Sequence, residues 1–583
     1  MPFSVGTLLA AASAILAIAA CGGGVATPSG QQAAPVSSAR AAIVPSAPTA
    51  ARPRTLSIVS TNDLHGRMGS LPLLAGYVAN LRAARKADGG GVLLLDGGDM
   101  FQGTLESNLG EGIGVVEGYS ALGYDAAAIG NHEFDFGPVG PHATPSAVGD
   151  DPRGALKALA AAAPFPFLGA NLRERGSAST PAWPHVKPST VVEVAGLRVG
   201  VVGLLTEETL QTTISANVTE LTIEPLAATL ASEAKRLRTS ARADVVVAVM
   251  HAGGKCATFG GDPLADRCEM ESEAFRLARA LPPGLVDAIF GGHSHAGVAH
   301  VIAGIPIAEG FAYGTHFSRV DITVEGSPLQ VVSRAVQPPR ELCPGKPRDP
   351  DWDKCDAGSY EGRPVLRDPK VASAIAPHLA KAAAKKATKL GVWLEAAIER
   401  RYDSESALGN LFADMLREGR DLRTIAMVNG GGLRADLPAG ELIYASLFEA
   451  FPFDNRIAVT SMTARDVASI VASNLQRSGG ILSISGVTVE AQCKSGKLEV
   501  KLRRGARLVP SEEKVTLVAS DFMMTGGDAF WADVKPPAVT SEDAFMRDVF
   551  ETSLRKKKRL APTSLYDAKK PRMASPPRPV RCL

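Results

Sequence analysis

Five apolar, β-prone runs of this chain are each followed directly by a short motif of Asp, Asn, His and Gly. The motifs are "STNDLHG", "DGGD", "GNHE", "HAGG" and "GGHSH", which begin at residues 60, 96, 130, 251 and 291. Ligands of α/β sheets bind at the carboxyl ends of the strands. Five loops that are far apart in the sequence are therefore predicted to meet at one crevice.

The five motifs share side chains that bind transition metals. Carboxylate, imidazole and amide oxygen are ligands of Mn, Fe, Zn and Co, and five of the ten histidines of the chain lie in these motifs. Each residue alone has an ordinary explanation, a polar turn or a structural histidine, but five sets in matching positions favour a metal site. The candidate ligands are Asp63, His65, Asp99, Asn131, His251, His293 and His295.

The order of the runs predicts an α/β fold. Near-continuous apolar strands alternate with helix-like segments rich in Ala, Leu and Arg, which is typical of a layered domain whose strands are covered on both faces. A chain of 583 residues is too long for one core, and two domains are expected. The net charge of +2 gives no field that would attract a nucleic acid polymer.

The amino-terminal segment predicts export. Residues 1–20 form an apolar run with small residues before Cys21, as in a signal peptide. The sequence "IAAC" resembles a lipobox, which implies a lipid anchor at Cys21 and a periplasmic or outer-surface lipoprotein. A transmembrane anchor is the alternative. Residues 21–54 are rich in Ala, Ser, Pro and Gly and are predicted to form a flexible tether.

The other cysteines fit an oxidising compartment. Cys256 lies near Cys268, and Cys343 lies near Cys355, which favours two local disulfides. Metal binding is the alternative, although no CxxC pair is present. Cys493 and Cys582 are left unassigned.

Composition predicts the remaining boundaries. The first domain is expected over 55–336, a linker with a connecting helix over 337–401, and a second α/β domain over 402–555. Residues 556–583 are basic and rich in Pro, and a disordered tail is expected there, with contact to an anionic lipid or polymer as an alternative. The sequence leaves the oligomeric state open.

Together the motifs "NDLHG", "GGD", "GNHEFDFG", "HAGG" and "GGHSH" resemble those of the calcineurin-like dinuclear metallophosphoesterases, in the branch of bacterial periplasmic 5'-nucleotidases. The resemblance implies an α/β/β/α amino-terminal domain with two divalent ions (Mn, Zn, Co or Mg) and attack of metal-bound hydroxide on phosphorus. It assigns Asp63, His65 and His295 to one ion, Asn131, His251 and His293 to the other, and Asp99 to both. His295 stands where some relatives have Gln.

The motif "GNHEFDFG" supplies two further residues in this resemblance. His132 and Asp135 are implied to act as a catalytic dyad, in which His132 stabilises the transition state and assists the leaving oxygen. Asp135 sets the tautomer of the ring. Glu133 is interpreted as structural.

The second half of the chain resembles the second domain of the same family. Its motifs "ESALGNLFAD", "NGGGLR", "FPFDN" and "DFMMTGGDAFW" occur in the family's order. The resemblance implies that two aromatic rings clamp the base and that a carboxylate holds the ribose hydroxyls. Ser404 stands where some nucleotidases have an Arg. The implied substrate residues are Asn429, Arg434, Phe453, Phe522 and Asp528.

These features favour a 5'-nucleotidase that acts on nucleoside monophosphates. The alternatives are a 2',3'-cyclic-nucleotide phosphodiesterase, a nucleotide-sugar or dinucleotide pyrophosphatase, and a thiosulfohydrolase, which would lack the paired phenylalanines. A nucleotide-binding surface lipoprotein without turnover is an alternative of another class. Such a binder would have lost ligand positions, whereas all of them are filled here.

Overall fold

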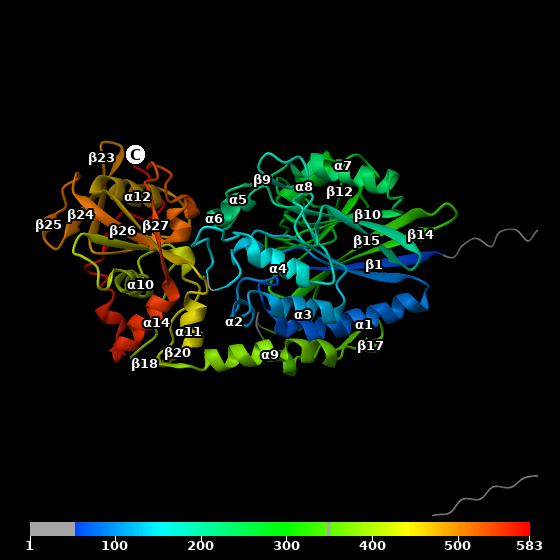
Figure 1. Ribbon diagram of the computed structural model, residues 1–583, viewed down its shortest axis with the longest axis horizontal. Coiled ribbons are helices and arrows are strands. Elements are labelled where there is room, and N and C mark those ends of the chain that lie inside the picture. Colours follow the sequence, from blue (N-terminus) through cyan, green and yellow to red (C-terminus); the bar gives the residue numbers. More distant parts are fainter. Residues whose placement is uncertain (1–52, 141, 347–349, 583) are drawn as a thin grey trace, which may run out of the picture. The chain divides into compact units, whose positions relative to one another are not determined.

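The computed structural model describes residues 53–140, 142–346 and 350–582 (Figure 1). The predicted signal peptide over 1–20, Cys21 and nearly all of the predicted tether lie outside the described residues. All described residues belong to one compact unit that spans Ala51–Leu583.

Two sheets form the centre of the amino-terminal lobe, which we define as residues 54–341. The first sheet has seven strands in the order β15-β14-β1-β2-β3-β4-β6, and the second has six in the order β12-β13-β11-β10-β8-β7. The strands of the first sheet are β15 (Gln330–Glu341), β14 (His316–Glu325), β1 (Arg54–Thr61), β2 (Gly91–Asp96), β3 (Ala126–Ala128), β4 (Phe167–Leu168) and β6 (Val186–Lys187). Those of the second are β12 (Gly297–Ile302), β13 (Ile305–Gly310), β11 (Ala288–Phe290), β10 (Val245–His251), β8 (Leu197–Leu205) and β7 (Ser189–Val194).

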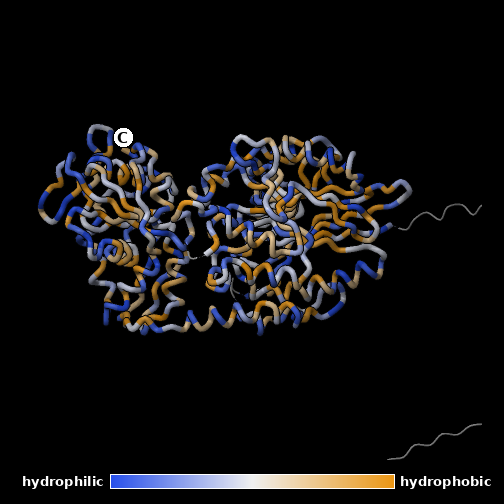
Figure 2. The backbone as a smooth tube through the Cα atoms, in the orientation of Figure 1, coloured by the Kyte–Doolittle hydropathy of each residue, from blue (hydrophilic) through white to orange (hydrophobic). Residues whose placement is uncertain are grey.

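Helices cover the outer face of each sheet. In β2, Leu93 and Leu95 point into the core between the sheets, whereas Leu94 packs in the core beneath the helices of the first sheet. Both faces of each inner strand are therefore apolar, as the near-continuous runs predict, and Figure 2 shows this hydrophobic interior. The predicted α/β/β/α layering is confirmed. The covering helices are α1 (Leu71–Ala87), α3 (Ile113–Leu122) and α4 (Gly154–Ala162) on one side, and α7 (Leu226–Thr239) and α8 (Glu273–Ala280) on the other.

The segment expected to be a linker is largely structured. Strand β15 continues to Glu341, beyond the expected boundary at residue 336. Helix α9 (Pro369–Lys386) begins at Asp368, whose carboxylate accepts hydrogen bonds from two backbone N–H groups of the first turn. It packs against α1, α3 and α2 (Leu105–Asn108), and it also contacts α11 (Tyr444–Ala450). The connecting helix is thus fixed along the amino-terminal lobe.

The carboxy-terminal lobe, residues 389–582, is built on a five-stranded sheet. The order is β22-β19-β26-β21-β27, with α10 (Ala407–Arg417) and α14 (Met546–Lys556) on one face and α12 (Ala464–Gln476) on the other. Two smaller sheets have the orders β25-β24-β23-β29 and β20-β18-β28. The strands are β18 (Lys389–Leu394), β19 (Thr424–Asn429), β20 (Gly440–Ile443), β21 (Arg456–Thr463), β22 (Leu482–Ser485), β23 (Thr488–Lys494), β24 (Lys497–Arg504), β25 (Arg507–Leu508), β26 (Lys514–Ser520), β27 (Thr540–Phe545), β28 (Arg559–Leu560) and β29 (Met573–Ala574).

The tail over 556–583 was expected to be disordered, and this prediction is wrong for its described residues. Strand β28 pairs with β18, β29 pairs with β23, and Cys582 forms a disulfide with Cys493. The guanidinium of Arg572 donates to both carboxylate oxygens of Asp414, at 2.6 and 2.7 Å. The basic, Pro-rich composition of the tail does not predict these contacts, because they join the tail to residues that are distant in the sequence.

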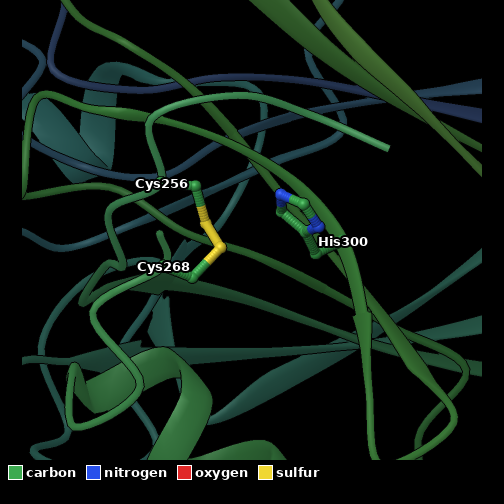
Figure 3. Close-up of side chains that lie close together, drawn as sticks. All are labelled: Cys256, Cys268 and His300. Atoms are coloured by element: carbon green, nitrogen blue, oxygen red, sulfur yellow. A yellow bond between two sulfur atoms is a disulfide. The ribbon is translucent and has the colours of Figure 1, made fainter. Parts of the chain in front are cut away.

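The two predicted local disulfides are present. Cys256 is bonded to Cys268, and Cys343 to Cys355. Figure 3 shows His300 beside the first of these, and its Nε2 donates to the carbonyl oxygen of Thr258 at 3.0 Å. Because both sulfurs are joined covalently, the alternative of a metal site at these cysteines is wrong.

Over the described ranges, every helix is too short or too polar to cross a bilayer.

Candidate active site

The five motifs meet at the carboxyl ends of strands from both sheets. Those that follow β1, β2 and β3 come from the first sheet, and those at the ends of β10 and β11 come from the second. Residues of these motifs form two groups. Within each group, the potential ligand atoms all lie within 4.8 Å of one another. The first group is Asp63, His65 and His295, and the second is Asp99, His251 and His293.

The first group surrounds one carboxylate oxygen. Oδ1 of Asp63 lies 3.2 Å from Nε2 of His295 and 3.9 Å from Nε2 of His65. The two imidazole nitrogens are 3.1 Å apart. The other oxygen of Asp63 accepts a hydrogen bond from the backbone N–H of His293 at 2.9 Å, which joins the loops after β1 and β11. These contacts fix all three side chains around a common point.

The second group surrounds His251. Its Nε2 lies 3.0 Å from Oδ2 of Asp99, 3.0 Å from Oδ1 of Asn131 and 3.2 Å from Nδ1 of His293. The same oxygen of Asp99 lies 3.9 Å from Nε2 of His65 in the first group. The carboxylate of Asp99 is therefore shared between the two groups.

Backbone carbonyls determine which atoms of these side chains face the centre. Nδ1 of His65 donates to the carbonyl of Gln102, and Nδ1 of His251 donates to that of Gly97, both at 2.9 Å. Each ring then directs the lone pair of Nε2 into the group. The amide of Asn131 donates to the carbonyl of Thr212 at 3.1 Å, which directs its oxygen inward.

Potential ligand atoms of Asp99, Asn131 and His251 thus converge, and all three side chains are buried. Burial opposes a charge on His251, but the neighbouring Asp99 and Asp63 outweigh it and raise the pKa of this ring to about 10. Burial lowers the pKa of His65 to about 3, which keeps that ring neutral. The centre therefore requires positive charge, and its donor set of carboxylate, amide and imidazole fits divalent transition metals.

The backbone of the ligand loops has an unusual conformation. Five of the seven residues have a positive φ, which costs roughly 1 kcal/mol or more for each residue that is not Gly. Such residues persist where the surrounding structure requires them, and they are typical of functional sites. The five are Asp63 (50°), His65 (49°), Asp99 (56°), His293 (74°) and His295 (55°).

Close backbone approach and one buried carboxylate hold the loops together. A Cβ atom at Gly130 would lie 2.2 Å from Oδ1 of Asp99, so only Gly fits at this position. The carboxylate of Glu133 accepts hydrogen bonds from the backbone N–H groups of Asp99, Met100 and Gly130 at 2.8, 2.7 and 2.6 Å. These contacts agree with the interpretation of Glu133 as structural.

His132 lies beside the two groups and belongs to neither. Its Nδ1 donates to Oδ2 of Asp135 at 2.5 Å, and the hydroxyl of Thr213 donates to the other oxygen of Asp135 at 2.9 Å. The backbone N–H of His132 donates to Oδ1 of Asp99 at 2.9 Å. The His132 ring therefore has a fixed orientation, and its Nε2 is not used by Asp135.

A cavity of about 1020 Å³ connects this centre with the carboxy-terminal lobe. His65, His132, Asp135 and His295 line it from the amino-terminal side, and all five predicted substrate residues line it from the other. The amide of Asn429 donates to the carboxylate of Asp528 at 2.7 Å, and the Arg434 guanidinium lies 5.8 Å from the centroid of the Phe453 ring. One cavity thus joins the catalytic pair and two of the predicted metal ligands with the predicted substrate residues. The five are Asn429, Arg434, Phe453, Phe522 and Asp528.

Known proteins are similar to this chain in sequence and in fold. The family model for the 5'-nucleotidase C-terminal domain matches residues 382–534. The chain is 26% identical over 509 residues to protein UshA of Yersinia enterocolitica, which covers 82% of this chain and 86% of that protein. It is 24% identical over 528 residues to the 5'-nucleotidase of Vibrio cholerae, covering 85% and 88% of the two chains. The chain is similar to bacterial 5'-nucleotidases over most of its length.

A solved structure agrees with this similarity at the level of the fold. The 5'-nucleotidase precursor of Thermus thermophilus superposes with a TM-score of 0.63 at 20% identity, covering 89% of this chain and 99% of that one. Two of the named relatives are 5'-nucleotidases, and this chain is a phosphoester hydrolase.

Several residues of the cavity were missed by the sequence analysis. The hydroxyl of Tyr313 lies 2.9 Å from Nδ1 of His295, so it orients a predicted ligand, but no motif marks it. Trp352 lines the cavity from the expected linker. Arg67 lines it as well, and its place directly after "NDLHG" is a signal that could have identified it.

Proposed function

We propose that the protein is an exported 5'-nucleotidase that releases phosphate from nucleoside 5'-monophosphates. One observation carries this proposal: a single cavity is lined both by His65 and His295 of the first ligand group and by the paired phenylalanines. A nucleotide placed in it would have its phosphate at the ligand groups and its base at the phenylalanine rings. The amino-terminal lobe would then be the metal-holding domain and the carboxy-terminal lobe the substrate domain.

The proposed ion sites follow the two groups. Asp63, His65 and His295 hold one divalent ion, Asn131, His251 and His293 hold the other, and Asp99 binds both. When bound, two such ions lower the pKa of water and neutralise charge on the phosphoryl oxygens. Backbone hydrogen bonds to Gln102, Gly97 and Thr212 orient three of these ligands, and such contacts strengthen metal binding.

His132 is proposed to act on the leaving oxygen of the ester. Asp135 holds its Nδ1, which leaves Nε2 to bind a phosphoryl oxygen or to donate a proton to the departing alkoxide. His132 lines the cavity and is partly exposed there, so a substrate can reach it.

The carboxy-terminal lobe is proposed to recognise the nucleoside. Phe453 and Phe522 are half-buried rings that line the cavity, and flat faces of this kind stack on any base. Asp528, which is exposed, accepts hydrogen bonds from the ribose hydroxyls. Its hydrogen bond from Asn429 holds the carboxylate in place.

Replacement of Phe522 by Ala is expected to weaken the binding of the base. Stacking of a base on an aromatic ring contributes about 1–3 kcal/mol, so the KM for AMP should rise about 10- to 100-fold. The KM for ribose 5-phosphate, which has the same phosphate and sugar but no base, should change little. Steady-state kinetics with both substrates measures this difference, and equal increases would refute the clamp.

Export is part of the proposal. Three disulfides join the six cysteines of the described residues, which supports an oxidising compartment. Residues 1–20 are proposed to be the signal peptide and Cys21 the site of lipidation.

A substrate panel tests the proposed activity. The protein is stripped of metal with a chelator and reloaded separately with Mn, Zn, Co or Mg. We expect phosphate release from AMP and UMP with the highest kcat/KM. A higher value for 2',3'-cyclic AMP, UDP-glucose or a dinucleotide would favour the corresponding alternative. No hydrolysis of any ester at full metal occupancy would favour a nucleotide-binding lipoprotein.

A further inference from the structure

Four basic side chains line the cavity in the described part of the chain, and they differ in what they bind. Nη2 of Arg367 lies 2.7 Å from a carboxylate oxygen of Asp353, and Lys386 donates to Glu106 at 2.5 Å. Both are therefore neutralised by an acidic partner. The other two are Arg67 and Arg434.

Arg434 is already accounted for by the predicted substrate site. Its Nη1 donates to the carbonyl of Gly431 at 3.3 Å, and its guanidinium faces the Phe453 ring. Arg67 has no acidic partner and no side-chain hydrogen bond to any described residue, and its Nε is buried. A buried guanidinium nitrogen without an acceptor is costly unless a ligand supplies one.

The position of Arg67 places this charge beside the metal centre. It follows the ligand His65 by two residues, and its backbone N–H closes a turn onto the carbonyl of Leu64 at 3.1 Å. Its guanidinium lies 4.9 Å from the centroid of the Tyr313 ring. Tyr313 contacts the centre twice, through its hydroxyl to His295 and through its backbone N–H to the carbonyl of Asp63 at 2.7 Å.

The carboxy-terminal lobe does not supply an equivalent charge from the segment before α10. Only Tyr402 of residues 400–404 lines the cavity. The guanidinium of Arg401 lies 5.8 Å from the ring of Tyr566, and Ser404 is exposed. The phosphate end of the cavity therefore depends on Arg67 for a guanidinium on the amino-terminal side.

We propose that Arg67 binds a terminal oxygen of a phosphate monoester at the metal centre and thereby selects monoesters over diesters. The inference rests on the proposed hydrolytic function. A monoester dianion has three terminal oxygens, so one remains for a guanidinium when two face the ions. A diester has one charge and two such oxygens, so Arg67 has less to bind. The planar fork of Arg suits phosphate oxygens.

The test compares two esters with the same leaving group, p-nitrophenyl phosphate and bis(p-nitrophenyl) phosphate. In the metal-loaded enzyme, Arg67→Ala should lower kcat/KM for the monoester about 10- to 100-fold, the effect of losing a hydrogen bond to a charged group. The kcat/KM for the diester should fall less than about threefold, because the diester offers Arg67 a weaker hydrogen bond to lose. Arg67→Lys, which keeps the charge but loses the fork, should give an intermediate loss. Arg367→Gln, which removes another charge that lines the cavity, should change neither value.

A binding measurement separates this inference from the proposed function. Inorganic phosphate is titrated by calorimetry into the metal-loaded protein, and its Kd should rise in Arg67→Ala but not in Arg367→Gln. An unchanged Kd, or an equal loss on both esters, would overturn the role of Arg67. A wild-type protein that hydrolyses neither of these esters nor AMP would instead refute the proposed function, and the titration would still test Arg67. Unfolding midpoints and metal contents establish that each variant is folded and loaded.

Discussion

Replacement of Asp99 by Ala is expected to abolish phosphoester hydrolysis and to remove metal from the protein. The carboxylate lies 3.0 Å from His251 and 3.9 Å from His65, so its loss affects both groups at once. Ions of this kind contribute several kcal/mol to the transition state, and kcat/KM should fall by about 1000-fold or more. Elemental analysis of the dialysed variant should give fewer than two ions per chain.

Asp99→Asn is the matched control for this result. It keeps an oxygen that can accept from the backbone N–H of His132, a contact of 2.9 Å, and removes only the charge. Metal loss in both variants would assign the effect to the shared carboxylate. Normal turnover with two ions bound in Asp99→Ala would exclude the bridging role.

Replacement of His132 by Ala should lower kcat strongly while two ions remain bound. General acid catalysis contributes about 10²- to 10⁴-fold, and His132 supplies no atom to either ligand group. The loss should be larger for AMP, whose leaving ribose oxygen needs a proton, than for p-nitrophenyl phosphate, whose leaving group departs as an anion. Kinetics with both substrates and elemental analysis measure these effects.

Asp135→Asn provides the comparison for His132. An amide oxygen can still accept from Nδ1 of His132, at the position where the carboxylate now lies at 2.5 Å, but it has no charge to stabilise an imidazolium. We expect an activity between those of the wild type and His132→Ala. Loss of an ion in His132→Ala would identify this residue as a ligand and reject the dyad.

The apolar runs predicted the meeting of the five motifs, whereas the two sheets from which they come were implied only by the family resemblance. The runs before "NDLHG" and before "HAGG" are equally apolar, because β1 and β10 are each buried on both faces. Burial on both faces arises in one sheet between helices and equally in two stacked sheets. Only strand pairing, which joins β1 to β2 and β10 to β8, distinguishes these arrangements.

Contacts between distant segments explain the other differences. Tyr313 orients His295 and supports Arg67, yet it lies in a short connection whose residues give no local signal. The tail has few apolar residues, but Met573 and Val580 are buried in the carboxy-terminal lobe. The composition of a segment indicates how much apolar surface that segment can bury by itself. It does not predict that the segment packs into a core formed by distant residues.

The left-handed backbone of the five predicted ligand residues has a consequence for the stability of the protein. Each of these residues costs conformational free energy that binding of ions can repay, so the same loops set both metal affinity and the stability of the chain. An exported protein cannot draw on the metal supply of the cell interior. In the proposed exported enzyme, the concentration of divalent ions in its surroundings would therefore govern how much folded protein persists as well as how fast each molecule turns over.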